Sequence, residues 1–271
     1  MQRSEAGKPR GIVHAATGPG YHKRYLPVAA LAPFIAHFWA VGWDLRGQPP
    51  RRVETLPHPS VHIVFETGRP AEIGGVHLGR FSRELCGLGR VFGIKFRPGG
   101  FYPFLGQAMT QMTGRVLPLT EVFGPESAKL TDQIMAMDAD EARIELAEAF
   151  LCDRLPAADP IIEQVIAMVD TIVADPGLTK VDDLVERFGL SKRNLQRVFR
   201  DYVGIAPKWM IQRYRLHEAL EQLTQSTPPD WSQLALSLGY FDQAHFIKDF
   251  RAVVGTTPKR YWDVRSAAPA A

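Results

Sequence analysis

The chain has 271 residues, of which 45% are hydrophobic and 23% are charged, and its formal net charge is +3. This composition excludes a disordered chain, and the length suits two domains that each bury a core. The small net charge gives no overall basic excess, so any nucleic-acid site must come from the local placement of charge.

Cysteine usage and hydropathy predict a cytoplasmic protein with no membrane partner. Cys86 and Cys152 show no paired spacing, which is typical of a reducing compartment. The opening MQRSEAGKPR lacks the apolar core of a signal peptide. No window approaches the ~18 uninterrupted apolar residues of a membrane-spanning helix.

Residues 1–155 are predicted to form a small β domain, a barrel or sandwich, closed by two helices. We expect residues 1–25, which are polar and rich in Gly and Pro, to be poorly ordered. Helical periodicity predicts the two helices at 127–137 and 139–155. Short apolar runs between turn residues predict strands at 34–43, 61–66, 72–78, 91–96 and 101–105.

Two other functions of this region are possible but less favoured. His58 and His62 would share one face of a strand, as metal ligands can. However, prolines on both sides hold His58 in a loop, and no HxH or HxxxE cluster follows. Cys86 has basic neighbours that can lower a thiol pKa, but no catalytic triad, Walker loop or GxGxxG motif accompanies it. We therefore expect no catalytic residue, no metal and no cofactor.

Nine aromatic residues of the β region leave two interpretations open. They fill the core, which we favour for most of them, or they line a pocket for an apolar ligand. The second interpretation would make the region a sensor. The residues are Phe34, Phe38, Trp39, Trp43, Phe65, Phe92, Phe96, Phe101 and Phe104.

The segment LPAADP at 155–160 combines two prolines, small residues and an acid, which predicts a domain boundary. A strongly apolar helix is expected directly after it, at 160–174. The second domain, at 160–265, is predicted to be all-helical. The fold class is therefore α+β, with a β-rich first domain and a helical second one.

Two similar segments organise the second domain: DLVERFGLSKRNLQRVFR at 183–200 and SQLALSLGYFDQAHFIKDFR at 232–251. Each has a short helix, a glycine (Gly189 or Gly239) and a second amphipathic helix. The glycines are 50 positions apart and the phenylalanines that follow are 51 apart, so the second turn carries one extra residue. This is the helix-turn-helix plan, whose second helix enters a DNA major groove. Double-stranded DNA is therefore the predicted partner.

The first unit carries the more basic surface. The N-terminal part of a recognition helix meets base edges, so we expect Arg193, Gln196 and Arg197 to read bases. Lys192 and Arg200 are expected to contact phosphates. The alternative interpretation, that these residues form only a solvent-exposed basic face, is less favoured because the second segment repeats the same plan.

The second unit presents Gln243, His245 and Lys248, with Asp249 nearby, so we expect weaker or more shape-dependent contact there. A long helix at 208–225 joins the units as a rigid connector. Such a connector suits two recognition helices that enter successive major grooves about 34 Å apart.

These residues resemble the DNA-binding domain of AraC/XylS-type regulators over about 160–265. The resemblance is carried by the G-x-x-P segments at 204–207 and 255–258, by Arg215-Leu216 and by GYFDQAHFIKDF. It implies a seven-helix domain that binds promoter DNA and recruits or regulates RNA polymerase. The DNA contacts that it implies are Arg193, Gln196, Arg197, Gln243, His245 and Lys248.

The N-terminal region resembles an uncharacterised domain found ahead of such readers, through GIKFRPGGFYPFLG and LPLTEVFG. The resemblance implies a small-molecule effector or a dimerisation role, hence a homodimer. The leading hypothesis is a sequence-specific transcriptional regulator that reads two adjacent major grooves and is not an enzyme. The alternative is an alkyl-transfer repair enzyme fused to a DNA reader, but neither Cys86 nor Cys152 has a nucleophile's setting.

Overall fold

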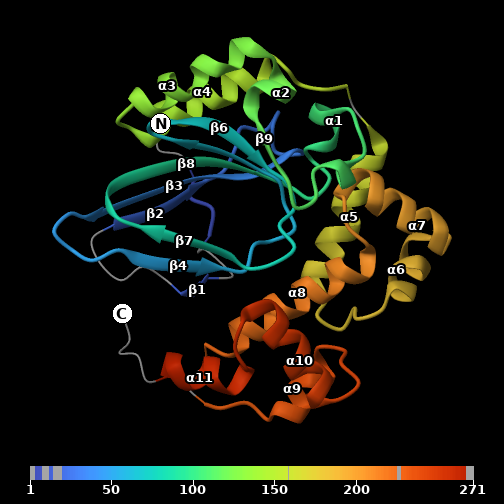
Figure 1. The fold of residues 1–271 in the computed structure, drawn as a ribbon. Coiled ribbons are helices and arrows are strands. Elements are labelled where there is room, and N and C mark those ends of the chain that lie inside the picture. The colour runs from blue at the N-terminus through green and yellow to red at the C-terminus, as the bar shows by residue number, and fades with distance from the viewer. Residues whose placement is uncertain (1–3, 8–11, 15–19, 158, 225–226, 267–271) are drawn as a thin grey trace.

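The computed structural model has a β-rich N-terminal region and a helical C-terminal region (Figure 1). It describes residues 4–7, 12–14, 20–157, 159–224 and 227–266. The α+β fold class predicted from the sequence is confirmed.

Among the described residues, nine strands form two antiparallel sheets, one of six strands and one of three. The smaller sheet lies beneath the larger one in the view of Figure 1, as two layers of a sandwich. The larger sheet runs β2 (Gly20–Tyr25), β3 (Ile35–Leu45), β8 (Gly87–Phe96), β5 (His62–Glu66), β6 (Arg69–Gly74) and β9 (Val116–Pro118). The smaller sheet runs β1 (Ile12–His14), β4 (Arg51–Thr55) and β7 (Phe81–Leu85).

One face of the larger sheet is dry and carries the main core. Strand side chains alternate between faces, and those that point toward the helices, such as Phe38, Phe65 and Phe92, are fully buried. The covering helices are α3 (Ala128–Ala136) and α4 (Asp140–Cys152), which lie across this face (Figure 1). Shorter elements close its end: α1 (Tyr102–Leu105), η1 (Met109–Gln111), α2 (Leu119–Phe123) and η2 (Pro125–Ser127).

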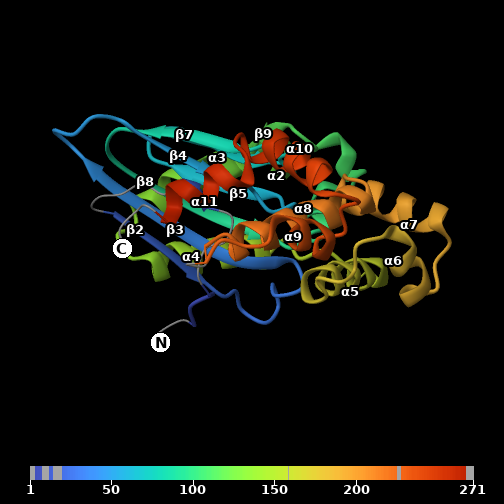
Figure 2. The same cartoon turned by 90° about the horizontal axis from the view of Figure 1, so that it is seen from below.

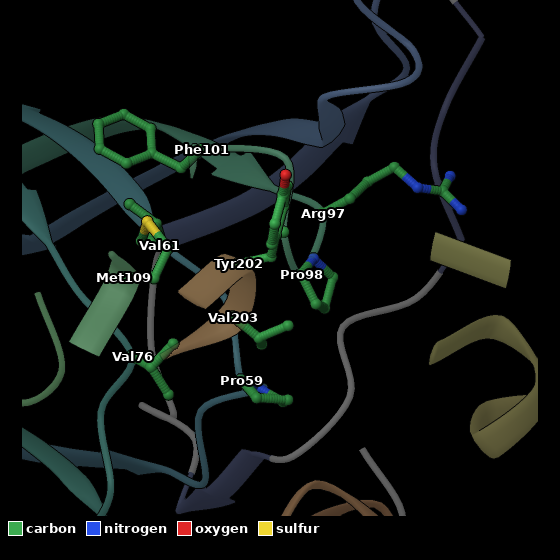
Figure 3. Close-up of a pocket in the computed structure, with 10 residues that line it drawn as sticks. Pro59, Val61, Val76, Arg97, Pro98, Phe101, Met109, Tyr202 and Val203 are labelled. Carbon is green, nitrogen blue, oxygen red and sulfur yellow. The ribbon is translucent and has the colours of Figure 1, made fainter. Parts of the chain in front are cut away.

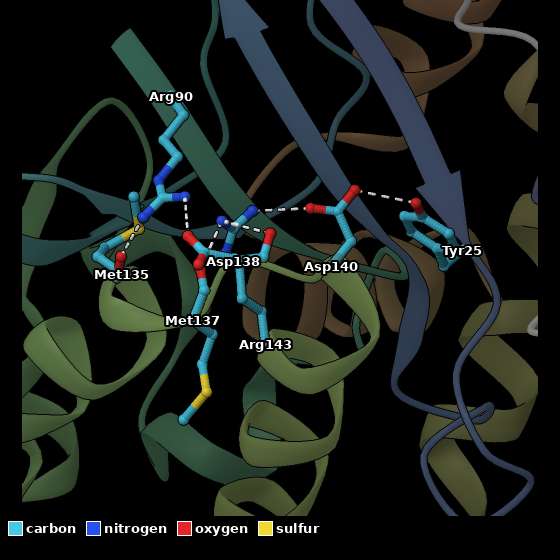
Figure 4. Close-up of polar contacts among 7 residues, drawn as sticks. All are labelled: Tyr25, Arg90, Met135, Met137, Asp138, Asp140 and Arg143. Carbon is cyan, nitrogen blue, oxygen red and sulfur yellow. Dashed lines mark hydrogen bonds and ion pairs between the residues drawn. The ribbon is translucent and has the colours of Figure 1, made fainter.

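A buried polar network ties the start of α4 to the sheet (Figure 4). Arg143 forms an ion pair with Asp140 at 2.7 Å and donates to the backbone carbonyls of Met137 and Asp138. Tyr25 of β2 donates to the other oxygen of Asp140 at 2.9 Å. Because these charged groups have partners, the network can remain buried without a large desolvation penalty.

The C-terminal region is helical throughout its described elements, and its helices form two groups (Figures 1 and 2). The first group lies beyond one end of the sheets, and the second lies below the smaller sheet. The elements are α5 (Pro160–Ala174), α6 (Val181–Phe188), α7 (Lys192–Val198), the π-helical turn η3 (Phe199–Val203), α8 (Pro207–Gln222), α9 (Trp231–Ser237), α10 (Gln243–Val254) and α11 (Pro258–Ser266).

Each helical group has its own apolar core, and one fully buried residue of the N-terminal region belongs to each core. Val76 joins the core that contains Leu184, Leu195 and Phe199. Leu56 joins the core built around α8, α9 and α10. The N-terminal region therefore packs against both groups.

Several sequence predictions were wrong in detail. The strand predicted at 101–105 is helix α1, because Pro103 suits a first helical turn and Gly106 ends it in a left-handed conformation, φ 66°. Residues 1–25, expected to be poorly ordered, include β2, which pairs with β3 along its length. Strand β6 spans Arg69–Gly74 rather than 72–78. Strands β1, β4, β7 and β9 were not predicted.

The helical region followed the sequence more closely. Helix α5 has the predicted bounds, 160–174. Helix α8 ends at Gln222, and residue 225 of its predicted span lies outside the described residues. In the described part of the chain, no helix is both long and apolar enough to cross a bilayer.

Candidate nucleic-acid interface

The first helix-turn-helix unit is built by α6, a glycine turn and α7. Gly189 ends α6 with φ 61°, a left-handed conformation that glycine adopts without strain. Ser191 then caps α7, its Oγ accepting from the backbone N–H of Asn194 at 3.2 Å. Leu195 and Val198 are buried in the core, so the opposite side of α7 faces solvent.

The three side chains predicted to read bases all lie on this exposed side. Arg193, Gln196 and Arg197 are each exposed. Arg193 makes no hydrogen bond or ion pair with any described residue, whereas Arg197 donates to the Asn194 side chain at 2.8 Å. The structure therefore brings the predicted readers together on one helix surface, free of the N-terminal region.

Two acids that sequence reasoning missed neutralise part of this surface. Lys192 lies 3.0 Å from Asp182, and Arg200 lies 2.9 Å from Asp201. The Arg197 guanidinium is 4.0 Å from the other oxygen of Asp201. Both acids lie outside the basic run, and Asp182 belongs to the preceding helix. The charge run alone could not identify these pairs.

The second unit repeats the capping pattern. Asp230 caps α9 by accepting from the backbone N–H groups of Ser232 and Gln233. Asp242 caps α10 by accepting from the backbone N–H of His245 at 2.7 Å. Because both helices start at acid caps, their positive N-terminal ends are partly compensated.

The predicted contacts of the second unit lie together on α10 but differ in accessibility. Lys248 and His245 are exposed, and the His245 ring nitrogen lies 3.6 Å from Asp249. Gln243 is half-buried and accepts from the Ser232 hydroxyl at 3.2 Å. This surface carries fewer cations than α7, as the sequence predicted.

An apolar side chain that sequence reasoning missed stands beside this surface. Phe241, in the turn that carries the extra residue, is 87% exposed. It precedes the Asp242 cap, and a shallow groove on α10 is lined by Ala244, Ile247 and Lys248. The spacing of the two units locates the extra residue in this turn, but it does not show that the phenylalanine is exposed.

The N-terminal region holds the first unit through η3. Tyr202 stacks on Tyr102 with ring centroids 4.0 Å apart and donates to Asp159 at 2.8 Å. Burial and Asp159 raise the pKa of Tyr202, so it stays a neutral donor. The Thr113 hydroxyl donates to the Gly204 carbonyl at 2.7 Å.

A small cavity lies in this contact (Figure 3). Its volume is about 10 Å³, and its lining includes Pro59, Val61 and Val76 from the β region and Tyr202 and Val203 from η3. This volume suits about one water molecule. The contact is therefore closely packed.

Helix α8, between the two units, carries a buried arginine that contacts the β region. Arg213 is 2% exposed, and its guanidinium donates to the backbone carbonyls of Pro57, Leu78 and Gly79. Its guanidinium carbon also lies 4.4 Å from the centre of the Trp209 ring. Burial lowers the pKa of Arg213 to about 10, which leaves it charged at neutral pH.

A second arginine contacts the end of the second recognition helix. Arg80 donates to the carbonyl of Val254, the last residue of α10, at 3.0 Å, and it pairs with Glu54 at 3.0 Å. A cation at a helix C-terminus is stabilising because the last carbonyls have no partner within the helix. The β region thus contacts both units, in each case at the C-terminal end of the second helix.

The remaining predictions concern the β region. Most of the aromatic residues fill the core, as favoured: Phe38, Phe65 and Phe92 are fully buried. His58 stacks on His217 of α8 with ring centroids 4.0 Å apart. Within the described residues, no group of three or more His, Cys, Asp or Glu side chains could hold a metal ion.

Comparisons with known proteins agree with this architecture. A family described as a helix-turn-helix domain matches residues 184–263, and a domain of unknown function (DUF6597) matches residues 23–118. The transcriptional regulator ArgR of Pseudomonas aeruginosa is 27% identical over 139 residues, which are 51% of this chain and 40% of that protein. The transcriptional activator AarP of Providencia stuartii is 37% identical over 81 residues, 30% of this chain and 59% of that protein.

Among solved structures, a regulator from Chromobacterium violaceum with an AraC-type DNA-binding domain is 29% identical, with a TM-score of 0.34. The match covers 38% of this chain and 91% of that one. The chain spans less than half the length of the first two curated relatives, 40% and 46%. The C-terminal part of the chain carries a helix-turn-helix domain that is similar to those of AraC-type regulators, and a domain of unknown function precedes it.

Proposed function

We propose that the chain is a sequence-specific transcriptional regulator whose two helix-turn-helix units read adjacent major grooves of promoter DNA. The observation that carries this proposal is the exposed surface of α7, where Arg193, Gln196 and Arg197 stand together opposite a buried stripe. The proposed domains are 1–155 and 160–265. We propose a cytoplasmic location, where promoter DNA is accessible.

In the first unit, two classes of contact are proposed. Arg193, Gln196 and Arg197 read base edges, because Arg pairs bidentately with guanine and Gln with adenine. Lys192 and Arg200 bind phosphates, which sets register but not sequence. Their partners Asp182 and Asp201 hold these cations in the free chain, so DNA phosphates exchange for carboxylates on binding. This exchange lowers the net electrostatic gain from phosphate contacts, and it does so for every DNA sequence alike.

In the second unit, recognition is proposed to depend more on shape and apolar contact. Gln243, His245 and Lys248 supply polar contacts. The exposed Phe241 ring is placed at the start of α10, where it would meet the C5-methyl group of thymine in the major groove. The expected preference of this half-site is therefore for A·T pairs.

The N-terminal region is proposed to control the reader through a small effector, to mediate homodimer formation, or both. Support comes from the contacts that it makes with both units, through Thr113 to η3 and through Arg80 to α10. A change in the β region that moved these contacts would change the relative placement of the recognition helices. We propose RNA polymerase as the protein partner at the promoter.

The alternative, an alkyl-transfer enzyme, is not favoured by the cysteines. Burial, together with Glu148 and Asp153, raises the pKa of the Cys152 thiol, which disfavours the reactive thiolate. Cys86 is exposed, and its backbone carbonyl accepts from the Trp43 indole. After incubation with an alkylated duplex, mass spectrometry of the chain should find both cysteines unmodified.

The proposal is tested by selecting genomic fragments that the full chain retains at moderate salt. We expect a shared sequence with two half-sites about 10 base pairs apart. Arg197→Ala should reduce enrichment and relax one base position, while Lys129→Ala, on the distant helix α3, should leave the selected sequence unchanged. Retention of fragments with no shared sequence would contradict the proposal.

A further inference from the structure

The face of the larger sheet opposite α3 and α4 carries polar side chains, unlike the apolar face that carries the main core. On neighbouring strands, His37 of β3 and His62 of β5 are both registered with Lys95 of β8. The three side chains therefore form one row across the sheet. This face is turned toward the smaller sheet, because Arg83 of β7 donates a hydrogen bond to Glu66, whose side chain lies on the same face as His62.

The row continues into β2 and is flanked by an indole. The Arg24 guanidinium lies 3.0 Å from Nδ1 of His37. The Trp39 indole lies edge-on to His62, with ring centroids 6.2 Å apart. It also rests on Gly93, where an added methyl group would come within 2.2 Å of the ring. The row thus has a guanidinium at one end and a flat apolar neighbour beside it.

Positive charge gathers here on Lys95 and on Arg24 of β2. Within the described residues, Lys95 makes no hydrogen bond or ion pair. Burial, with the charge of Arg24, lowers the pKa of Lys95 to about 7. Burial, with neighbouring cations, lowers the pKa of His62 to about 3 and that of His37 to about 2. The Trp39 Nε1–H is also buried with no acceptor among the described residues. A buried donor without a partner, such as the Trp39 Nε1–H, and a half-buried cation without one, such as Lys95, destabilise a fold unless something else binds them.

A metal ion does not fit this row. The guanidinium of Arg24 and the ammonium of Lys95 would repel it, and no carboxylate of the described residues completes a ligand set there. An anion fits, because it accepts from Lys95 and from the Trp39 Nε1–H and reduces the repulsion between Lys95 and Arg24.

We propose that the row His37, Lys95 and His62, with Arg24 and Trp39 beside it, is a binding site for a small organic carboxylate. The carboxylate accepts from Lys95, and the apolar part of the ligand lies along the Trp39 indole. The inference rests on the proposed effector control and names the chemical class of the effector.

The position of the site connects it to the reader. Lys95 is two residues before Arg97, which forms an ion pair with Asp170 of α5 at 2.7 Å. His62 follows Val61, which lines the small cavity against Tyr202 of η3. A ligand that moved these two strand ends would act directly on the contact with the first helix-turn-helix unit.

The test uses the full chain without DNA, at about pH 6, where Lys95 is protonated and a carboxylate is ionised. Acetate and benzoate are titrated at constant ionic strength, with acetamide and benzamide as uncharged matches. We expect benzoate to raise the melting temperature by several degrees and benzamide to have no effect. A thermal shift that is equal for acid and amide, or absent for both acids, overturns the proposal.

Two variants assign the effect to the row. Lys95→Gln should weaken benzoate binding at least tenfold, while Lys129→Gln, the same exchange at an exposed lysine of α3, should bind like the original chain. Without ligand, Lys95→Gln should melt at a higher temperature, because it removes an unpaired cation. Unchanged benzoate binding by Lys95→Gln overturns the site.

The pH dependence provides a readout that needs no ligand. The folded chain binds the Lys95 proton more weakly than the unfolded chain, whose lysine has a pKa of 10.5. Stability should therefore rise with pH between about 7 and 10.5, and this rise should be smaller in Lys95→Gln.

The failure of this inference can be distinguished from the failure of the proposed function. If the chain binds benzoate but no DNA, this inference stands and the proposed function is wrong. If the chain binds DNA but no carboxylate, this inference is wrong and the proposed reading of DNA stands.

Discussion

The two helix-turn-helix units share a plan but differ in surface and in attachment. Both have a glycine turn and a capped second helix, with Ser191 in the first unit and Asp242 in the second. The first presents guanidinium groups that are partly held by Asp201. The second presents one lysine beside an exposed phenylalanine, Phe241.

The two units also differ in the residues of the N-terminal region that hold them. The first unit is held at η3, just after α7, by Thr113 and by the stacked tyrosines. The second is held at the last carbonyl of α10 by Arg80. The local sequence is enough to form the motif twice. The contacts that each copy makes depend on the segments of the β region that pack against it.

The largest expected effect comes from the helix that both units share. Arg213→Met removes a buried guanidinium and leaves the carbonyls of Pro57, Leu78 and Gly79 without their donor. We expect a loss of about 2–3 kcal/mol in the free energy of unfolding. Chemical denaturation measures it, with Gln212→Met, a half-exposed neighbour on α8, as the control. Equal stability of the two variants would show that Arg213 does not hold the regions together.

The next effect separates the two reading surfaces. Arg197→Ala should cost about 1–3 kcal/mol of affinity for the selected site and relax one base position. Lys248→Ala should weaken binding to all sequences by less, and should reduce the salt dependence by about one unit of slope. Titrations at several salt concentrations measure both. A larger loss of specificity for Lys248→Ala would invert the comparison between the units.

A smaller effect compares the two turns. A methyl group at Gly189 would meet no atom within 4 Å, whereas one at Gly239 would lie 2.4 Å from Cβ of Thr179. Both positions have positive φ, so each alanine variant carries about 1–2 kcal/mol of backbone strain. Gly239→Ala should lose about 1 kcal/mol more than Gly189→Ala in thermal denaturation. If Gly189→Ala is the more damaging variant, close packing against Thr179 does not limit the second turn.

The smallest effect concerns attachment of the first unit. Thr113→Val removes the hydroxyl that donates to the Gly204 carbonyl and should cost about 1 kcal/mol. Hydrogen exchange should become faster in η3 and remain unchanged in α10. Faster exchange in both units together would show that they respond as one body.

The sequence predicted what depends on near neighbours along the chain. The exposed side of α7, with Arg193, Gln196 and Arg197, follows from helical periodicity. Strands β4 and β7 were missed because RRVET and FSREL are polar and show no apolar alternation. These two segments form strands because they pair with each other, although their composition does not indicate strands.

Contacts between distant segments were not predictable from the residues alone. Arg213 and Leu78 are separated by 135 positions, and nothing local marks this arginine as buried. Asp201 is adjacent to Arg200, but its position between two arginines depends on the turn of η3. The row formed by His37, His62 and Lys95 exists only through strand register.

The most direct test of reading by two units is base interference on the selected site, by methylation of guanine N7 and by replacement of thymine with uracil, which removes the C5-methyl group, so that major-groove contacts of both units are reported. We predict two clusters of interference on one face of the duplex, about 10 base pairs apart. Arg197→Ala should remove interference at one position of the first cluster, and Phe241→Ala with Lys248→Ala should weaken only the other cluster. A single cluster, or the loss of both clusters on changing Arg197 alone, would contradict reading by two units.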